Sequence, residues 1–173
     1  MFGVTKQDLP DSALLGVYER SDGSYTDCYS TDAPGEIDLG KFVAAFYTTW
    51  LFKLERFILK HAVSRPSTDQ DARDVSEGKT DRFAAWTVES RTSNQLLMCD
   101  MAGRTRSWFM VRSNEVGTRL YFGSAVVPKK GGDANLGVVF SALLGFHKLY
   151  SRALLAAAVR RLSGQRVSSI QSG

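Results

Sequence analysis

The chain has 173 residues, of which 43% are hydrophobic and 23% are charged, and its formal net charge is +4 at pH 7. This length and composition are typical of one soluble globular domain, which we expect over 1–173 with flexible ends at about 1–8 and 164–173. The net charge is mild, and the Lys and Arg residues are spread along the chain, so we do not expect nucleic acid as a partner.

The N-terminus and the apolar segments predict the location of the protein. Residues 1–10 contain no apolar run and carry Lys6 and Asp8, which is unlike a signal peptide. The longest charge-free segments, 42–52 and 134–147, are shorter than the ~20 residues that a membrane-spanning helix needs. We therefore expect a cytoplasmic protein without integral membrane association.

Cysteine and histidine are sparse. Cys28 and Cys99 are the only cysteines, and we expect reduced thiols in the core rather than a disulfide framework. His61 and His147 are far apart in the sequence and lack cysteine or carboxylate neighbours at ligand spacing, which argues against a metal site. Glycine-rich phosphate loops and a Gly-x-Ser-x-Gly motif are absent. The sequence predicts no cofactor, no metal and no catalytic motif.

The first part of the chain predicts one strand followed by a pair of helices. The segment 25–31 follows a turn-forming cluster at 21–24 and has the composition of a strand. Asp38 is placed to cap a helix, and apolar residues recur at helical spacing over 42–61. The threonines at 48–49 are poor helix formers, so we expect a bend there that separates two helices.

The second part of the chain predicts an antiparallel meander and a long helix. A polar connection over 64–80, with one helical turn near 72–76, leads into the meander. An amphipathic helix with a wide apolar face is expected over 135–162. Four strands joined by tight turns are expected at 82–90, 94–101, 104–112 and 118–127.

The turns of the meander fix which side chains share a face, because side chains alternate along a strand. A two-residue loop between the second and third strands predicts Leu96 opposite Phe109, and the next loop predicts Phe109 opposite Phe122. A three-residue loop between the first and second strands predicts Trp86 opposite Met98. We expect these apolar residues on the face toward the C-terminal helix: Trp86, Val88, Leu96, Met98, Phe109, Val111, Leu120 and Phe122.

A small polar group is expected at one end of this apolar face. An apolar concavity with a few polar groups at one end is the general layout of a small-molecule site, whereas nearness to solvent alone would also explain such a group. His147 lies on the apolar face of the terminal helix, where it is either a hydrogen-bonded core residue or a group that meets a ligand. The polar group is Asp100, Thr105, Ser107 and Ser124, and the expected ligand-binding residues are Trp86, Asp100, Ser107, Ser124, His147 and Tyr150.

The opposite face of the meander predicts a contact surface. It would carry apolar residues bordered by arginines, with Trp108 opposite Gly123. An outer face with this much apolar area either seats a second copy of the chain or is covered by the chain's own N-terminal segment, and both interpretations stay open. The expected interface residues are Leu97, Trp108, Met110 and Tyr121.

The order of a strand, a helix pair, a meander and a long terminal helix resembles the helix-grip fold of the START and polyketide-cyclase superfamily. The segments 9–10, 45–49 and 145–150 also resemble an uncharacterised bacterial family within it. The resemblance implies an α+β fold in which a curved antiparallel sheet packs on the long C-terminal helix, with a cavity for an apolar small molecule. A cone-shaped α+β fold of the nuclear-transport-factor kind is the alternative.

Three functions follow from these predictions, and we rank a binder of a small apolar molecule first. The second is a homo-oligomeric interaction module that uses the Trp108 face. The third is an enzyme of the cyclase or dehydratase type, with His147 and Asp100 as acid and base. The third function requires both side chains to face one cavity.

Overall fold

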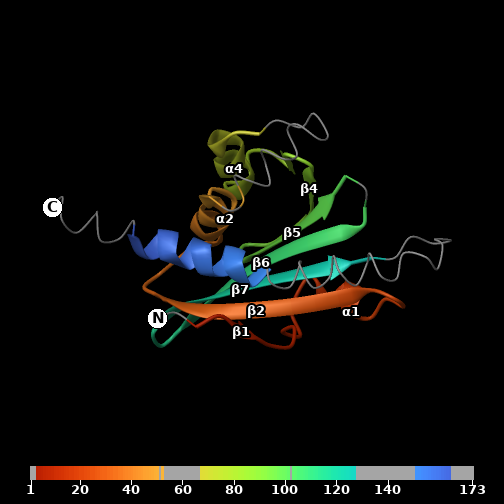
Figure 1. Ribbon diagram of the computed structural model, residues 1–173, viewed down its shortest axis with the longest axis horizontal. Helices are drawn as coiled ribbons and strands as arrows, with labels where there is room; N and C mark the ends of the chain where they lie inside the picture. Colours follow the sequence, from red (N-terminus) through yellow and green to blue (C-terminus); the bar gives the residue numbers. More distant parts are fainter. Residues whose placement is uncertain (1–2, 51, 53–66, 102, 128–150, 165–173) are drawn as a thin grey trace.

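The computed structural model describes residues 3–50, 52, 67–101, 103–127 and 151–164 (Figure 1). These residues form one seven-stranded antiparallel sheet in the order β1-β2-β7-β6-β5-β4-β3. The longer helices pack on one face of this sheet, and the short helix α1 lies on the other. The predicted α+β fold with an antiparallel sheet and a C-terminal helix is confirmed. The strands are β1 Thr5–Lys6, β2 Tyr25–Pro34, β3 Arg82–Phe83, β4 Trp86–Arg91, β5 Gln95–Asp100, β6 Thr105–Asn114 and β7 Gly117–Val126. The helices are α1 Gly16–Glu19, α2 Leu39–Tyr47, α4 Asp69–Ser76 and the C-terminal helix segment 151–164.

The helices begin and end where side chains satisfy backbone groups. Asp38 caps α2, since its Oδ1 accepts a hydrogen bond from the Lys41 backbone N–H at 2.7 Å. The helix is interrupted at 48–49, as predicted, and the Thr49 hydroxyl donates to the Phe46 carbonyl at 2.9 Å. The second predicted helix and the start of the 135–162 helix lie outside the described residues. α4 is longer than the predicted turn because Thr68 and Asp71 form a reciprocal capping box.

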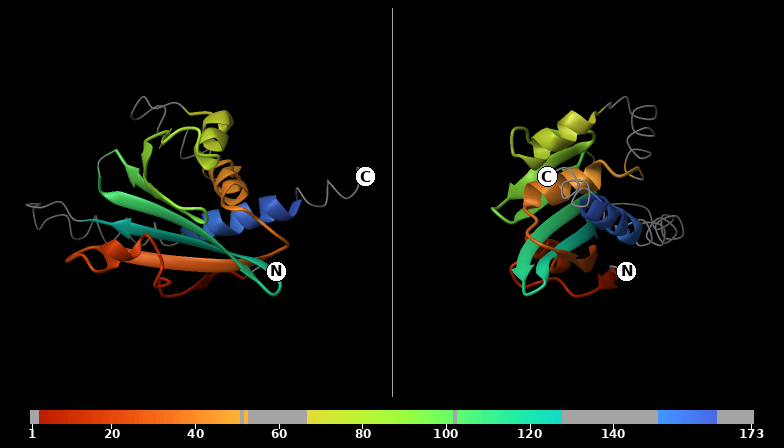
Figure 2. Two further views of the ribbon diagram at one scale, coloured as in Figure 1. Left: turned by 180° about the vertical axis from the view of Figure 1, so that it is seen from behind. Right: turned by 90° about the vertical axis from the view of Figure 1, so that its left-hand side faces the viewer.

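Aromatic side chains fill one half of the inner face, which is the face toward the helices. Phe46 of α2 packs on Phe109 and Phe122, with ring centroids 4.9 and 4.6 Å away. Phe109 and Phe122 are themselves 5.2 Å apart. The same core includes Leu154 and Leu155, so the C-terminal helix segment lies on this side of the sheet, as both views in Figure 2 show. This half of the inner face is solid core.

Two of the three predicted registers are confirmed. Leu96 pairs with Phe109, and Phe109 pairs with Phe122. The predicted β4–β5 register is wrong by two residues, because Trp86 pairs with Asp100 rather than with Met98. Two features cause the error: a turn after β3 shortens the first predicted strand, and an irregularity interrupts the β4 ladder between Val88 and Ser90. A shift of two preserves the face, so all eight predicted apolar residues do lie on the inner face.

The outer face of the sheet is covered by an N-terminal strap, which we define as residues 9–18. Trp108 pairs with Gly123, as predicted, and Trp108 is 0% exposed. A Cβ on Gly123 would lie 2.9 Å from Leu15 Cδ2 and 3.0 Å from Trp108 Cε3, so only glycine allows Leu15 to sit this close. The predicted exposed contact surface is therefore corrected: Leu97, Trp108, Met110 and Tyr121 are buried core residues beneath the strap.

Gln95 anchors the strap from the sheet. Its Oε1 accepts hydrogen bonds from the Leu14 backbone N–H at 3.0 Å and from Trp108 Nε1 at 2.9 Å. Its Nε2 donates to the Ser12 carbonyl at 3.0 Å. One buried amide thus satisfies two main-chain groups of the strap and the only polar atom of the Trp108 ring. Cys28, beneath the strap, is a free thiol whose burial raises its pKa to about 12.

We expect Phe46→Ala to lower the free energy of unfolding by ~3–5 kcal/mol, because it removes the ring that joins α2 to Phe109 and Phe122. Urea denaturation measures the change. Val116→Ala is the control, since Val116 is 69% exposed and its truncation should change stability by less than ~0.5 kcal/mol. Equal effects of the two substitutions would contradict the described core.

We expect Gln95→Leu to lower the free energy of unfolding by ~2 kcal/mol, because it leaves the Trp108 ring N–H and two strap groups without their partner. Hydrogen exchange should also accelerate at the Leu14 amide. Gln70→Leu on the exposed surface of α4 is the control and should leave exchange in the strap unchanged. Unchanged exchange at Leu14 in the Gln95 variant would show that the strap is held in another way.

Candidate functional site

Three polar side chains lie side by side across the inner face, and we call them the polar row: Asp27 of β2, Ser124 of β7 and Ser107 of β6. Asp27 pairs with Ser124, and Ser124 pairs with Ser107, so the row crosses three adjacent strands. Asp27 is 3% exposed, Ser124 is fully buried and Ser107 is half-buried. The row lies beside the aromatic core, in the direction of the β5–β6 turn.

Asp27 and Ser124 are joined by two hydrogen bonds. Asp27 Oδ1 accepts from the Ser124 backbone N–H at 3.1 Å and from the Ser124 hydroxyl. Burial of a carboxyl group is costly unless donors of this kind surround it. A buried carboxyl group with two donors on one oxygen is a fixed polar feature on an otherwise apolar sheet face.

Tyrosine rings flank Asp27 on the same face of β2. Tyr25 precedes it and Tyr29 follows it at the two-residue spacing that places all three side chains on one side of a strand. Burial, followed by the nearby Asp27 carboxylate, raises the pKa of both phenols to about 12. Both tyrosines are therefore neutral at physiological pH.

Two further hydroxyl groups on the inner side of the sheet are buried without a hydrogen-bond partner among the described residues. Thr31, on the same face of β2 as Asp27, is 3% exposed, and Ser151 of the C-terminal helix segment is 1% exposed. Neither hydroxyl oxygen has a hydrogen-bond partner in the part of the chain that the structure describes. Buried polar atoms are nearly always paired in native proteins, so an unpaired one points to strain or to a bound partner such as water, an ion or a ligand.

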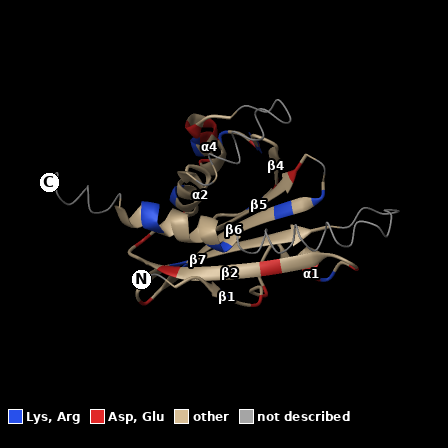
Figure 3. Cartoon of the chain, viewed as in Figure 1, with Lys and Arg blue, Asp and Glu red and all other residues tan. Residues whose placement is uncertain are grey.

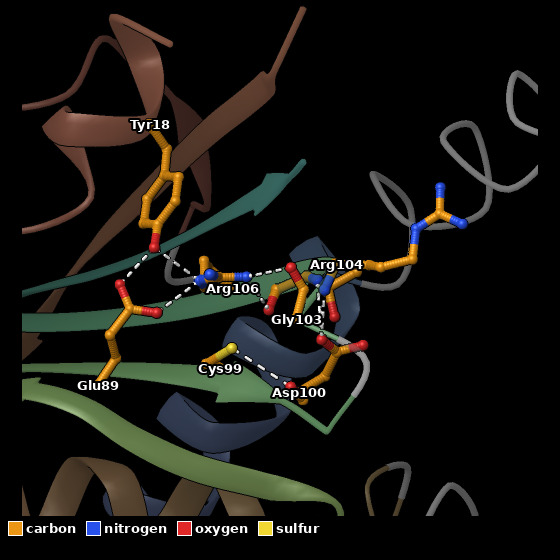
Figure 4. A network of polar contacts seen from close by, with 8 residues as sticks. Tyr18, Glu89, Cys99, Asp100, Gly103, Arg104 and Arg106 are labelled. Carbon is orange, nitrogen blue, oxygen red and sulfur yellow. Dashed lines mark hydrogen bonds and ion pairs between the residues drawn. The ribbon is translucent and has the colours of Figure 1, made fainter. Parts of the chain in front are cut away.

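Asp100 stabilises the β5–β6 turn (Figure 4). Its Oδ1 accepts hydrogen bonds from the backbone N–H groups of Arg104 at 2.7 Å and Thr105 at 3.1 Å. The carboxylate therefore closes the turn from the inner face, which is sufficient to explain its position. Its partner in the acid–base hypothesis, His147, lies outside the described residues, so that hypothesis stays a prediction.

A second network closes the same turn from the outer face (Figure 4). Arg106 Nε donates to Glu89 Oε2 at 2.6 Å and to the Tyr18 hydroxyl at 2.9 Å, while Arg106 Nη1 donates to the Gly103 carbonyl at 2.9 Å. Tyr18 in turn donates to Glu89. Burial and then the Glu89 contact raise the pKa of Tyr18. The network ties the strap, β4 and β6 together and keeps Arg106 on the face opposite the polar row.

The structure places four predicted ligand-binding residues at one end of the inner face. Trp86 is half-buried opposite Asp100, and Ser107 and Ser124 belong to the polar row. His147 and Tyr150 lie outside the described residues. Sequence reasoning missed Asp27, because its position depends on pairing with a strand nearly a hundred residues away.

In comparisons with known proteins, no family model, no curated protein and no solved structure matches the chain. Among the described residues, no three histidine, cysteine or carboxylate side chains gather as metal ligands would. No helix within the described ranges is both long enough and apolar enough to span a bilayer.

We expect Asp100→Ala to lower the free energy of unfolding by ~1–2 kcal/mol, because two turn N–H groups lose their acceptor. Asp100→Asn keeps an oxygen in the same place and should retain most of that stability. Chemical denaturation of both variants measures the difference. If the two substitutions destabilise equally, the charge of Asp100 rather than its hydrogen bonds to the turn is what matters.

Proposed function

We propose that the protein binds a small, largely apolar molecule against the polar row, between the sheet and the C-terminal part of the chain. The polar row itself is the observation that carries the proposal. The same face around Phe46 is aromatic and aliphatic, so the polar row interrupts an otherwise apolar surface. Buried polar groups lower stability unless they are compensated, and a ligand that they orient gives them a role.

The architecture supports a helix-grip fold, which is part of this proposal. β2 lies next to β7, and the strands that follow β7 across the sheet are β6, β5, β4 and β3, in reverse sequence order. The described helices α2 and α4 and the C-terminal helix segment pack on the inner face alone. In the START-like proteins that the sequence resembles, such a face and the long terminal helix enclose an apolar ligand.

Packing limits where a ligand fits. The half of the inner face around Phe46 is filled by rings 4.6–5.2 Å apart. At the other end, Trp86, Val88, Thr105 and Ser107 are only half-buried. We therefore place the ligand over the second group, with its apolar body on Trp86 and Val88 and its polar group at the polar row.

A neutral fluorophore tests the proposal. N-phenyl-1-naphthylamine brightens in apolar surroundings, and the wild-type protein should bind it saturably at one site. Ser107→Leu places an apolar side chain in the polar row and should weaken binding by about tenfold, equivalent to ~1.4 kcal/mol. Titration followed by fluorescence measures the dissociation constants.

Ser113→Leu is the matched control, because Ser113 is an exposed serine near the far end of the same strand. Its affinity for the fluorophore should equal that of the wild type. Absence of saturable binding to the wild-type protein, or equal losses in the two leucine variants, would refute the proposed site. Native mass spectrometry of the purified protein gives an independent readout through any co-purified small molecule.

A further inference from the structure

The carboxylate of Asp100 has one oxygen that the β5–β6 turn does not use. Both turn N–H groups, from Arg104 and Thr105, donate to Oδ1. No hydrogen bond or ion pair joins Oδ2 to another described residue, and no dashed line reaches it among the residues drawn in Figure 4. The side chain is half-buried, so Oδ2 is an acceptor whose position on the inner face is fixed by the turn.

The basic side chains of the described residues around Asp100 are directed elsewhere. Arg104 extends away from Asp100 in Figure 4, and Arg106 is held on the outer face by the second network. Arg91 lies on the inner side at the opposite end of β4, where it donates to the Val75 carbonyl of α4 at 2.6 Å. Charged residues are otherwise sparse on the central strands, which are tan over most of their length in Figure 3. Within the described ranges, the two turn N–H groups thus offset the charge of Asp100.

The inner-face neighbours of Asp100 come from the adjacent strands. Trp86 of β4 lies directly opposite Asp100, and Val88 of β4 lies opposite Met98. Met98 in turn lies opposite Ser107 of β6. Neighbouring strands are about 5 Å apart, and diagonal neighbours such as Asp100 and Ser107 are about 7–8 Å apart. A molecule seated on the two β4 side chains is therefore one strand away from Asp100 and two strands away from Ser107.

The polar atoms around this position include both an acceptor and donors. Oδ2 of Asp100 accepts only, whereas the hydroxyls of Thr105 and Ser107 donate as well as accept. A ligand hydroxyl can donate to Asp100 and accept from Ser107 at the same time, but a ketone can only accept. A protonated amine can only donate, and moving its charge out of water costs more than moving a neutral hydroxyl. The hydroxyl group therefore matches this set of atoms best.

We infer that the ligand is an apolar molecule with a hydroxyl group, which donates a hydrogen bond to Asp100 Oδ2 while the apolar body lies on Trp86 and Val88. This inference rests on the proposed function and specifies the class of ligand. Ser107, the member of the polar row nearest to β4, donates to the oxygen of the same ligand hydroxyl. Asp100 is then the residue that determines specificity for a hydroxyl over a carbonyl group.

Three ligands with the same ring system test the inference: 1-naphthalenemethanol, 1-acetylnaphthalene and 1-naphthylmethylamine. Their polar groups are a hydroxyl, a carbonyl and, at pH 7, an ammonium group. In calorimetric titration of the wild-type protein, the alcohol should bind about tenfold more tightly than the ketone, because only the alcohol donates to the carboxylate. The amine should bind more weakly than the alcohol, because its charge must be desolvated.

Asp100→Asn replaces the acceptor at the Oδ2 position with a donor. The two turn N–H groups orient the amide oxygen toward themselves, so the amide NH₂ group takes the place of Oδ2. An NH₂ group donates to a ketone as well as to an alcohol, and it accepts from neither. The variant should therefore lower the alcohol-to-ketone affinity ratio about tenfold, as the same titrations measure.

Asp38→Asn is the matched control, because Asp38 also binds a backbone N–H group, that of Lys41, through one carboxylate oxygen. The substitution removes the same charge at the start of α2, and Asn is an equally good N-cap residue. The alcohol-to-ketone ratio should keep its wild-type value in this control. The wild-type ranking of the three ligands decides the question by itself if the Asp100 variant does not fold.

The outcomes separate the two proposals. If neither N-phenyl-1-naphthylamine nor any of the three ligands binds, the proposed function fails. If the ligands bind but the ketone or the amine equals or exceeds the alcohol in affinity, only the inference about the hydroxyl group fails. An unchanged alcohol-to-ketone ratio in a folded Asp100→Asn variant would also overturn that inference.

Discussion

The antiparallel pairing of β2 with β7 is the interaction on which the rest of the structure depends. It runs from Tyr25 opposite Val126 to Pro34 opposite Gly117 and joins the first long strand to the last one (Figure 1). On the inner face it places Asp27 beside Ser124, and on the outer face it places Cys28 beside Gly123 beneath the strap. The polar row and the packing of Leu15 against Gly123 both depend on this pairing.

The two faces of the sheet meet opposite requirements. The outer face achieves tight closure, since Gly123 admits Leu15 and Gln95 satisfies the main chain of the strap. The inner face is equally tight around Phe46 but includes a buried carboxyl group and serines toward the β5–β6 turn. That turn is stabilised from both sides, by Asp100 on the inner face and by Arg106 on the outer face. A ligand site needs polar groups that are held in place by the surrounding packing and hydrogen bonds, so that they keep their positions before the ligand binds.

Local sequence was sufficient where turns determine structure. Loop lengths gave the correct registers for β5–β6 and β6–β7, including Trp108 opposite Gly123. The β4–β5 register was missed because the ladder irregularity after Val88 has no clear signature in the sequence. The error of two residues nevertheless kept Trp86 on the inner face, because side chains alternate between the faces of a strand. The two correct registers placed Ser107 beside Ser124, so part of the site could be predicted.

The remaining features depend on contacts between distant segments. The sequence could not decide whether the Trp108 face met a partner or the strap, because both leave the same apolar pattern on the strands. Asp27 could not be assigned to the site, since its neighbour Ser124 follows 97 residues later. An isolated aspartate in a strand of modest quality carries no signal of such a partner.

Methionine positions provide the most direct test of the central claim that the inner face at the polar row binds a small molecule. Met98 lies on the inner face opposite Ser107, whereas Met110 lies on the outer face beneath the strap. NMR spectra of protein labelled with ¹³C at the methionine methyl groups can be recorded during titration with 1-naphthalenemethanol. The account predicts a saturable shift of the Met98 methyl signal, with intermolecular NOEs to the naphthalene ring, and an unchanged Met110 signal. Ring contacts at Met110 and none at Met98 would contradict it.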